Sequence, residues 1–188
     1  FGSPTKKTIL TSMVMMIIAL SVVLSLPNEA AAPIAAKGCI TPLKTYPHLE
    51  TSFTQGLVWF DGALVESTGH YGRSQLLRLE LQNASPTQSH PLQPTYFGEG
   101  LAWVENHPTQ GRDVLIQLTW KQNTAFVYDA HSFALLKSYT YGGEGWGLCF
   151  NGQHYVMSDG TDTLQKRSLE DFSLLGTVKV RLDGKAQP

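Results

Sequence analysis

Three glutamates and Trp146 in this sequence lie in glycine-containing segments, and Trp120 lies in a polar segment that ends a predicted strand; all five could contribute to one site. Acids and indoles are unusual in the inner strands of a β-protein, because Val and Ile are easier to bury there than a carboxylate. A carboxylate in an apolar channel can have a raised pKa and carry a proton, and indole rings can wall a pocket. The candidate site residues are Gln55, Glu66, Glu99, Trp120, Glu144 and Trp146.

Each of these residues also has a structural interpretation. A lone buried acid often accepts backbone N–H groups, and tryptophans in repeat β-proteins often pack between repeats. The neighbouring glycines can serve close packing alone. Three acids and two indoles at repeat-equivalent places nevertheless favour a shared site.

Several other kinds of site have no support in the sequence. It has no Cys-x-x-Cys or His-Glu-x-x-His pattern, and its six histidines have no common spacing, so no zinc site is indicated. The glycine-rich run at 143–147 lacks the strand-then-helix context of a nucleotide loop. We therefore expect no metal or other cofactor. The net charge of −1, with scattered basic residues, gives no reason to expect nucleic acid as a partner.

An internal repeat is expected to position the candidate residues. Gly-Leu pairs begin at Gly56, Gly100 and Gly147, with spacings of 44 and 47 residues, and further short apolar segments follow each pair. Four short antiparallel strands in a unit of about 45 residues are typical of a β-propeller blade. A β-sandwich would not explain the recurring pair, and a solenoid of this period is usually helical. The repeat therefore predicts an all-β propeller.

The repeat also predicts where turns lie and how many blades the sequence can form. Asp-Gly at 61–62 and Asn-Gly at 151–152 indicate tight hairpins, and polar turns are expected at 66–69, 119–121 and 158–161. Asp-Gly at 183–184 indicates a last turn with no closing strand. Residues 46–188 suffice for about three blades, whereas propellers need about four to eight to close. We therefore expect a propeller truncated to about three blades.

The N-terminal region resembles a targeting segment. Lys6 and Lys7 precede an apolar run at 9–26, and three alanines follow at 30–32. These are the parts of a secretory signal, so we predict a signal peptide at 1–32, a linker at 33–45 and export to the periplasm or medium. An uncleaved membrane anchor is the alternative. Export would permit a Cys39–Cys149 disulfide, but the apolar run around Cys149 favours a buried free thiol.

Seven motifs together resemble the glutaminyl-peptide cyclotransferases of plants and bacteria, in that family's order. They are Tyr-Pro-His at 46–48, Phe-Thr-Gln-Gly-Leu at 53–57, Glu-Ser-Thr-Gly-His-Tyr-Gly-Arg-Ser at 66–74, Tyr-Phe-Gly-Glu-Gly-Leu at 96–101, Gln-Leu-Thr-Trp-Lys at 117–121, Glu-Gly-Trp-Gly-Leu at 144–148 and Met-Ser-Asp-Gly-Thr at 157–161. The sequence departs from the family at Leu49, where an Asp is usual. It also lacks the later Leu-Asn-Glu-Leu-Glu and Ala-Asn-Val-Trp motifs.

The resemblance implies a five-bladed β-propeller that converts an N-terminal glutamine of peptides to pyroglutamate and releases ammonia. It implies Glu66 as the proton carrier, with Trp120 and Trp146 walling the pocket, no cofactor, and a monomer when complete, with no membrane association after signal cleavage. The further substrate-binding candidates are Gln55, Glu99 and Glu144. A non-catalytic propeller that binds a peptide or sugar is the alternative function, and a purely structural scaffold is another.

Overall fold

The computed structural model describes residues 42–187, and the chain divides into two compact units, Phe1–Thr45 and Tyr46–Pro188. The predicted signal peptide, Cys39 and residues 33–41 of the predicted linker lie outside the described residues. Cys149 is half-buried with a free thiol. Within residues 42–187, no helix has the length and apolar character needed to cross a membrane.

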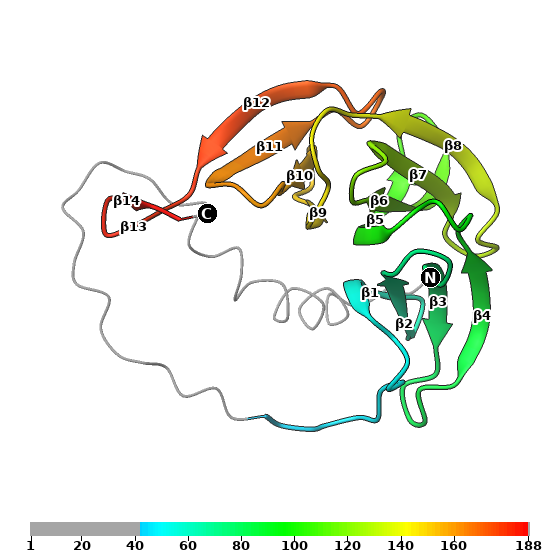
Figure 1. Ribbon diagram of the computed structural model, residues 1–188. Coiled ribbons are helices and arrows are strands. Elements are labelled where there is room, and N and C mark those ends of the chain that lie inside the picture. The colour runs from blue at the N-terminus through cyan, green and yellow to red at the C-terminus, as the bar shows by residue number, and fades with distance from the viewer. Residues whose placement is uncertain (1–41, 188) are drawn as a thin grey trace, which may run out of the picture. The chain divides into compact units, whose positions relative to one another are not determined.

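Three four-stranded antiparallel sheets form the second unit, each built from four strands consecutive in sequence (Figure 1). The strands are β1 (Thr54–Phe60), β2 (Ala63–Thr68), β3 (Gln75–Leu79), β4 (Pro86–Pro91), β5 (Gly98–His107), β6 (Arg112–Thr119), β7 (Thr124–Asp129), β8 (Leu135–Thr140), β9 (Leu148–Phe150), β10 (Tyr155–Met157), β11 (Thr163–Arg167) and β12 (Leu174–Lys179). In Figure 1, β1, β5 and β9 are innermost, and β4, β8 and β12 lie at the periphery. This arrangement confirms the predicted four-stranded blades.

The repeated glycines lie where the inner strands approach one another most closely. A Cβ atom added to Gly56 would lie 2.5 Å from the backbone nitrogen of Leu101, and one added to Gly100 would lie 2.4 Å from the carbonyl oxygen of Trp146. The amide of Gly100 also donates a hydrogen bond of 2.7 Å to that oxygen. Successive blades therefore contact backbone to backbone at these positions, which only glycine permits.

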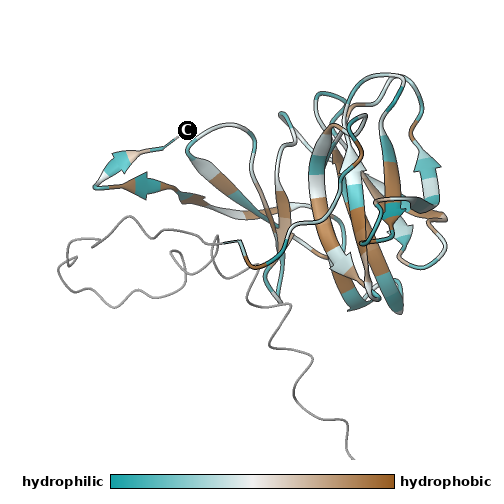
Figure 2. Cartoon of the chain, turned by 90° about the horizontal axis from the view of Figure 1, so that it is seen from below, coloured by the Kyte–Doolittle hydropathy of each residue, from teal (hydrophilic) through white to brown (hydrophobic). Residues whose placement is uncertain are grey.

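Two hydrophobic cores lie between neighbouring sheets, and Figure 2 shows apolar residues concentrated along the strands. The core between the first and second sheets contains Phe60, Val65, Leu76, Leu101, Leu115, Tyr128, Ala130 and Phe133. The core between the second and third contains Val104, Val114, Ile116, Leu118, Ala125, Val127, Tyr139, Tyr141, Tyr155, Met157 and Phe172. The middle sheet thus packs on both faces, which explains why six consecutive residues of β6 are buried.

The predicted polar turn at 66–69 is instead largely a buried strand end, whereas the turn at 119–121 is confirmed except at its first residue. Trp120 and Lys121 lie in the turn that follows β6. Glu66, Ser67 and Thr68 belong to β2, and Thr119 is the last residue of β6; all four are buried. Their side chains form hydrogen bonds within the unit, so their polarity does not place them at the surface. The Asp-Gly hairpin between β1 and β2 is confirmed, with positive φ at Asp61 and Gly62.

Strand β4 was not evident from the sequence because its residues, Pro-Thr-Gln-Ser-His-Pro, are polar and flanked by proline. It is an edge strand that pairs only with β3, so its outer N–H groups need no partner in the sheet. Proline and polar residues on such an edge also disfavour pairing with other chains.

The last predicted turn does have a closing strand, contrary to expectation. Asp183 and Gly184 both have positive φ and connect β13 (Arg181–Leu182) to β14 (Lys185–Ala186) in a short hairpin. Type I′ turns need this conformation at both central residues, and Asp-Gly is well suited to it.

Candidate active site

Glu99 is the buried carboxylate at the start of inner strand β5. It is 8% exposed, and the side-chain amide of Gln55 hydrogen-bonds its carboxylate. Burial raises the pKa of Glu99 to about 7, and the nearby negative charge of Glu144 adds to this effect, whereas the Gln55 hydrogen bond opposes it. A carboxyl group with this pKa can accept and release a proton near neutral pH.

Glu144 links both candidate tryptophans. Its Oε2 accepts hydrogen bonds from the indole Nε1 of Trp120 at 2.7 Å and of Trp146 at 3.0 Å. Lys121 adds an ion pair of 3.7 Å to Oε1, and its Nζ lies 3.8 Å from the centre of the Trp120 ring. The two indole hydrogen bonds and Lys121 lower the pKa of Glu144, so its carboxylate stays ionised near neutral pH.

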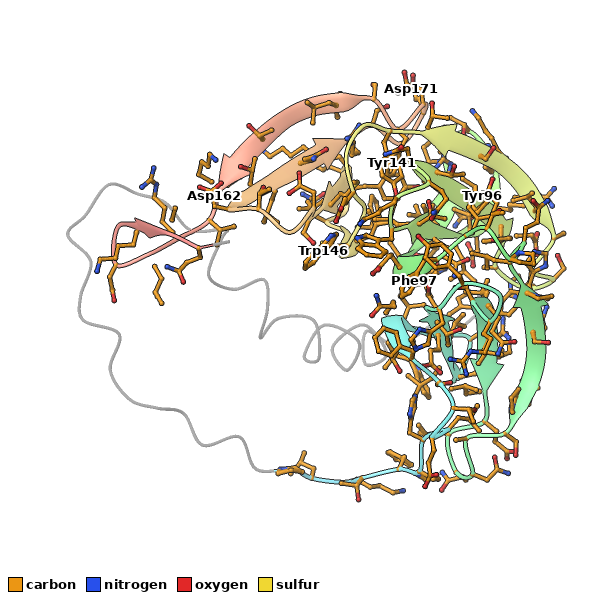
Figure 3. All side chains as sticks on the ribbon, viewed as in Figure 1. Tyr96, Phe97, Tyr141, Trp146, Asp162 and Asp171 are labelled. Atoms are coloured by element: carbon orange, nitrogen blue, oxygen red, sulfur yellow. The ribbon has the colours of Figure 1, made fainter. Side chains whose placement is uncertain are left out.

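Aromatic rings extend this cluster along the ends of the inner strands. Phe97 contacts Trp120 edge to face, with ring centroids 5.6 Å apart. Figure 3 shows Phe97 and Trp146 on the side where the inner strands lie. Trp146 is 47% exposed, and its ring packs so closely over Gly160 that a Cβ atom there would lie 2.7 Å from it. An exposed indole held in a fixed orientation is suited to contact a ligand.

A buried polar network fixes the backbone of Glu99. The Ser67 hydroxyl donates to the Glu99 carbonyl at 2.5 Å and accepts from the amide of Gln117 at 2.8 Å. The Tyr128 hydroxyl donates to the other end of Gln117 at 3.3 Å. Sequence reasoning missed these residues, although a glutamine within the apolar run of β6 was the available signal. A satisfied buried network of this kind holds a functional side chain in one orientation.

Glu66, the predicted proton carrier, lies in a different cluster. Its side chain is fully buried on β2. Its carboxylate contacts three polar side chains, two from the segment before β1 and one from the first residue of β1. Ser52 Oγ donates to Oε2 at 3.3 Å, Thr54 Oγ1 donates to Oε1 at 2.5 Å, and His48 Nε2 lies 3.1 Å from Oε1. These partners are polar, unlike the apolar channel expected around this carboxylate.

The structure therefore brings together five of the six candidate residues. The five are Gln55, Glu99, Trp120, Glu144 and Trp146. They come from the start of β1, the start of β5, the β6–β7 turn and the segment before β9, which are equivalent ends of successive blades. Among residues 42–187, no group of three or more His, Cys, Asp and Glu side chains is placed to hold a metal ion.

Comparisons with known proteins identify close sequence and structural relatives. A sequence model of the family described as glutamine cyclotransferase matches residues 14–188. The glutaminyl-peptide cyclotransferase of Arabidopsis thaliana is 32% identical over 142 residues, which cover 74% of this chain and 42% of that protein. The crystal structure of Myxococcus xanthus glutaminyl cyclase is 38% identical with a TM-score of 0.66, covering 75% of this chain and 56% of that one.

A more distant structure supports the fold alone. The Neurospora crassa Pan2 WD40 domain superimposes with a TM-score of 0.54 at 10% identity, over 67% of this chain and 36% of that domain. WD40 domains are propellers of four-stranded blades, so the three sheets are blades of a β-propeller. The chain spans 42% of the Arabidopsis relative and 56% of the Myxococcus structure. Since the family match covers residues 14–188, the chain belongs to the glutamine cyclotransferase family.

Proposed function

We propose that the protein carrying this chain is a glutaminyl-peptide cyclotransferase in which Glu99 carries the proton. The observation that supports this most directly is a buried carboxyl with a pKa of about 7, hydrogen-bonded by Gln55 beside two tryptophans oriented by Glu144. Family membership supports the same reaction. The expected substrate is a peptide or protein with N-terminal glutamine.

The reaction is an intramolecular acyl transfer. The neutral α-amine of the substrate attacks its own side-chain amide carbon, so that a C–N bond forms and closes a five-membered ring. The C–N bond to the amide nitrogen then breaks, and ammonia leaves with the proton that the α-amine loses. Nucleophile and electrophile belong to one residue, so the protein needs no nucleophile of its own.

Glu99 suits the proton transfer in both directions. As a carboxylate it accepts a proton from the attacking amine, and as a carboxylic acid it donates that proton to the departing nitrogen. Its pKa of about 7 is close to the usual α-amine value of about 7.7–8.0, so neither transfer is strongly uphill. Trp120 and Trp146 provide walls for the glutaminyl side chain, while ionised Glu144 keeps them in place.

The test uses the full-length protein and measures ammonia released from a peptide beginning with Gln. A matched peptide beginning with Asn is the control, because Asn would have to close a four-membered ring. Glu99→Gln keeps the shape of the side chain but cannot carry the proton, so we expect turnover to fall roughly 10²–10⁴-fold. The absence of turnover by the wild-type protein would favour the non-catalytic binding function.

Glu66→Gln is the matched comparison, because it makes the same chemical change at the other buried carboxyl. We expect a smaller loss of turnover in this variant, since the Glu66 carboxylate is held by Ser52, Thr54 and His48. Near-normal turnover in Glu99→Gln together with a large loss in Glu66→Gln would return the proton-carrying role to Glu66.

We also propose that the protein is exported, cleaved after the N-terminal apolar run and monomeric. The lysines, apolar run and alanines of residues 6–32 support export. N-terminal sequencing of the protein recovered from the periplasm or medium tests the cleavage, and retention of residues 1–32 would favour the membrane anchor.

A further inference from the structure

A pocket lies beside the aromatic end of the cluster described above. Its volume is about 420 Å³, and it is bounded by the segment before β1, the loop between β2 and β3, and the end of β4. The residues on which the argument depends are Ser52, Thr68, His70, Arg73 and Ser74. None of them belongs to the Glu99 cluster.

The loop that forms one wall of this pocket is held in a single conformation. Its backbone N–H groups at Arg73 and Ser74 both donate to the carbonyl of His70, at 3.0 and 2.8 Å. The Ser74 hydroxyl also donates to that carbonyl, at 2.8 Å, and accepts from the amide of Gly98 at 3.0 Å. The loop is thereby tied to the residue that precedes Glu99.

His70 occupies the left-handed region with a φ of +82°, although it is not glycine. Non-glycine residues in this conformation are strained, and such strain is often found where a loop contacts a ligand. The His70 ring is held between two other rings, with its centroid 4.3 Å from that of Phe53 and 5.7 Å from that of Phe97.

Arg73 supplies an unpaired positive charge at this pocket. Its side chain is exposed, and no partner for its guanidinium exists among the residues that the structure describes. The residues that line the pocket include no Asp or Glu. Glu66 accepts a hydrogen bond from Ser52, which lines the pocket, but the Glu66 side chain is fully buried and also contacts His48. The pocket therefore favours an anion.

A line of ring contacts connects this pocket to the glutamine site. Trp120 contacts Phe97 at 5.6 Å between centroids, and Phe97 contacts His70 at 5.7 Å. The two steps together span about 11 Å, which about three residues of an extended peptide cover at about 3.3–3.6 Å each. A peptide with its first residue at Glu99 would thus place its third or fourth residue near Arg73.

We propose that this pocket binds the substrate peptide downstream of the N-terminal glutamine, with Arg73 pairing with a peptide carboxylate. The proposal rests on the proposed function and adds a preference among its substrates. The carboxylate can belong to an acidic side chain or to the C-terminus of a short peptide. The guanidinium geometry suits either source, because it can donate two parallel hydrogen bonds to one carboxylate.

The experiment compares peptide pairs that differ only in one carboxylate, using the full-length protein at low ionic strength. Gln-Ala-Ala with a free C-terminus is compared with its amide, and Gln-Ala-Glu-amide is compared with Gln-Ala-Gln-amide. We expect kcat/KM to be about two- to fivefold higher for the carboxylate member of at least one pair, as for an exposed ion pair, with the difference reduced by added salt.

Arg73→Gln should bring that ratio to one, and Arg73→Lys should retain part of it. Arg181→Gln is the matched control, because Arg181 is an exposed arginine on β13, outside the pocket, and this variant should keep the wild-type ratio. A ratio of one in the wild-type protein for both pairs, or a ratio that survives in Arg73→Gln, would overturn the proposal. A higher kcat/KM for Gln-Ala-Ala than for its amide would identify the peptide C-terminus as the carboxylate, and a higher kcat/KM for Gln-Ala-Glu-amide than for Gln-Ala-Gln-amide would identify an acidic side chain.

The same peptides distinguish this proposal from the proposed function. Turnover of Gln-Ala-Ala-amide by the wild-type protein reports on cyclisation alone. If no peptide is turned over, calorimetric Kd values for Asn-Ala-Ala and its amide still decide on Arg73, because these peptides bind without cyclising. The same two- to fivefold preference, lost in Arg73→Gln, is expected there.

Discussion

Glu99 and Glu144 show how two carboxyl groups in one site acquire different protonation states. Burial raises the pKa of Glu99 to about 7, whereas hydrogen bonds from two indoles and the Lys121 charge lower that of Glu144. Opposite shifts of neighbouring carboxyl groups are typical of sites that need one proton carrier and one permanent charge. Each charge state also depends on the other, because Glu144 contributes to the high pKa of Glu99.

The pH dependence of catalysis should reflect this coupling. Glu99 accepts a proton in the proposed reaction, so kcat/KM should rise with pH through about 7 as its carboxyl deprotonates. Glu144→Gln removes the neighbouring negative charge, which lowers the pKa of Glu99, so the rise should shift to lower pH. Profiles of kcat/KM between pH 5 and 9 measure the shift, and an unmoved or upward-shifted acid limb would contradict the coupling.

The sequence predicted the five residues that the structure brings together, but not the surroundings of the sixth candidate, Glu66. Gln55, Glu99, Glu144 and Trp146 stand next to the repeated Gly-Leu pairs, and Trp120 ends the second strand of its repeat, so their convergence follows from the repeat. The surroundings of Glu66 depend on how a segment without regular structure folds back on β2. The spacing of residues gives no information about such a tertiary contact, and the same is true of the Ser67–Gln117–Tyr128 network.

The inner strands of neighbouring blades contact each other at glycines, so a glycine-to-alanine substitution tests how much stability depends on that close contact. We expect Gly100→Ala to destabilise the protein by about 1–3 kcal/mol, because its Cβ would lie 2.4 Å from the Trp146 carbonyl and 2.5 Å from the Leu148 nitrogen. These are backbone atoms, so the blades themselves would have to move. Denaturant titration measures the change in the free energy of unfolding.

Gly176→Ala is the control for this substitution. Gly176 lies on peripheral strand β12, has nothing within 4 Å of the added Cβ, and does not have a positive φ. Alanine there should be neutral or slightly stabilising. Equal losses of stability in the two variants would show that the close contact at Gly100 is not what requires glycine.

A buried histidine at the end of β5 should make the contact between the second and third blades sensitive to acid. His107 is fully buried; its Nδ1 accepts from the Thr109 amide at 3.3 Å, which leaves Nε2 to donate to the Tyr155 hydroxyl at 3.0 Å. Burial, with a contribution from the Lys137 charge, lowers the pKa of His107. The folded state therefore holds this ring neutral.

The stability contributed by neutral His107 should be complete above the unfolded pKa of about 6.5 and should decrease as pH falls below it. The unfolded chain binds a proton in that range, whereas the folded chain does not until its lower pKa is reached. Comparison of unfolding free energies at pH 7.5 and 5 should show a larger decrease in the wild-type protein than in His107→Asn. His131→Asn, at an exposed histidine, should behave as the wild-type protein does.

The elements that the sequence predicted correctly are those with apolar character or strong turn signals. The second and third strands of the first two blades are rich in apolar residues, and the Asp-Gly hairpin has a strong turn signal. Strand β4 has neither, because an edge strand needs no apolar face on its outer side and tolerates proline. The polar end of β2 was predicted as a turn because residue type does not show whether a buried partner is available.

The described unit exposes apolar side chains on β1 and on β12. Leu57 and Trp59 are 51% and 45% exposed on β1, on the opposite face from Val58 and Phe60, which pack in the first core. Leu174 and Leu175, on β12, are 54% and 62% exposed. Apolar residues gathered in this way are associated with interaction sites or aggregation.

A polypeptide limited to residues 46–188 should accordingly bind a hydrophobic dye and self-associate. The double variant Leu57→Thr, Trp59→Thr should bind less dye, because threonine keeps a high preference for strands while removing the apolar surface. Dye fluorescence and sedimentation velocity measure both effects, with the full-length protein as reference. A monomeric 46–188 polypeptide that binds no dye would contradict the prediction.

The position of the two cores implies that the three blades differ in how readily they unfold locally. The middle blade contributes to both cores, whereas the first and third each contribute to one. In a polypeptide limited to residues 46–188, stability is approximately a sum of nearest-neighbour terms, so the first or the third blade can detach after losing one interface, but the middle blade only after losing two. In that polypeptide, backbone amides of β6 and β7 should therefore exchange with deuterium most slowly, and those of β3 and β11 should exchange earlier, in two separate cooperative steps.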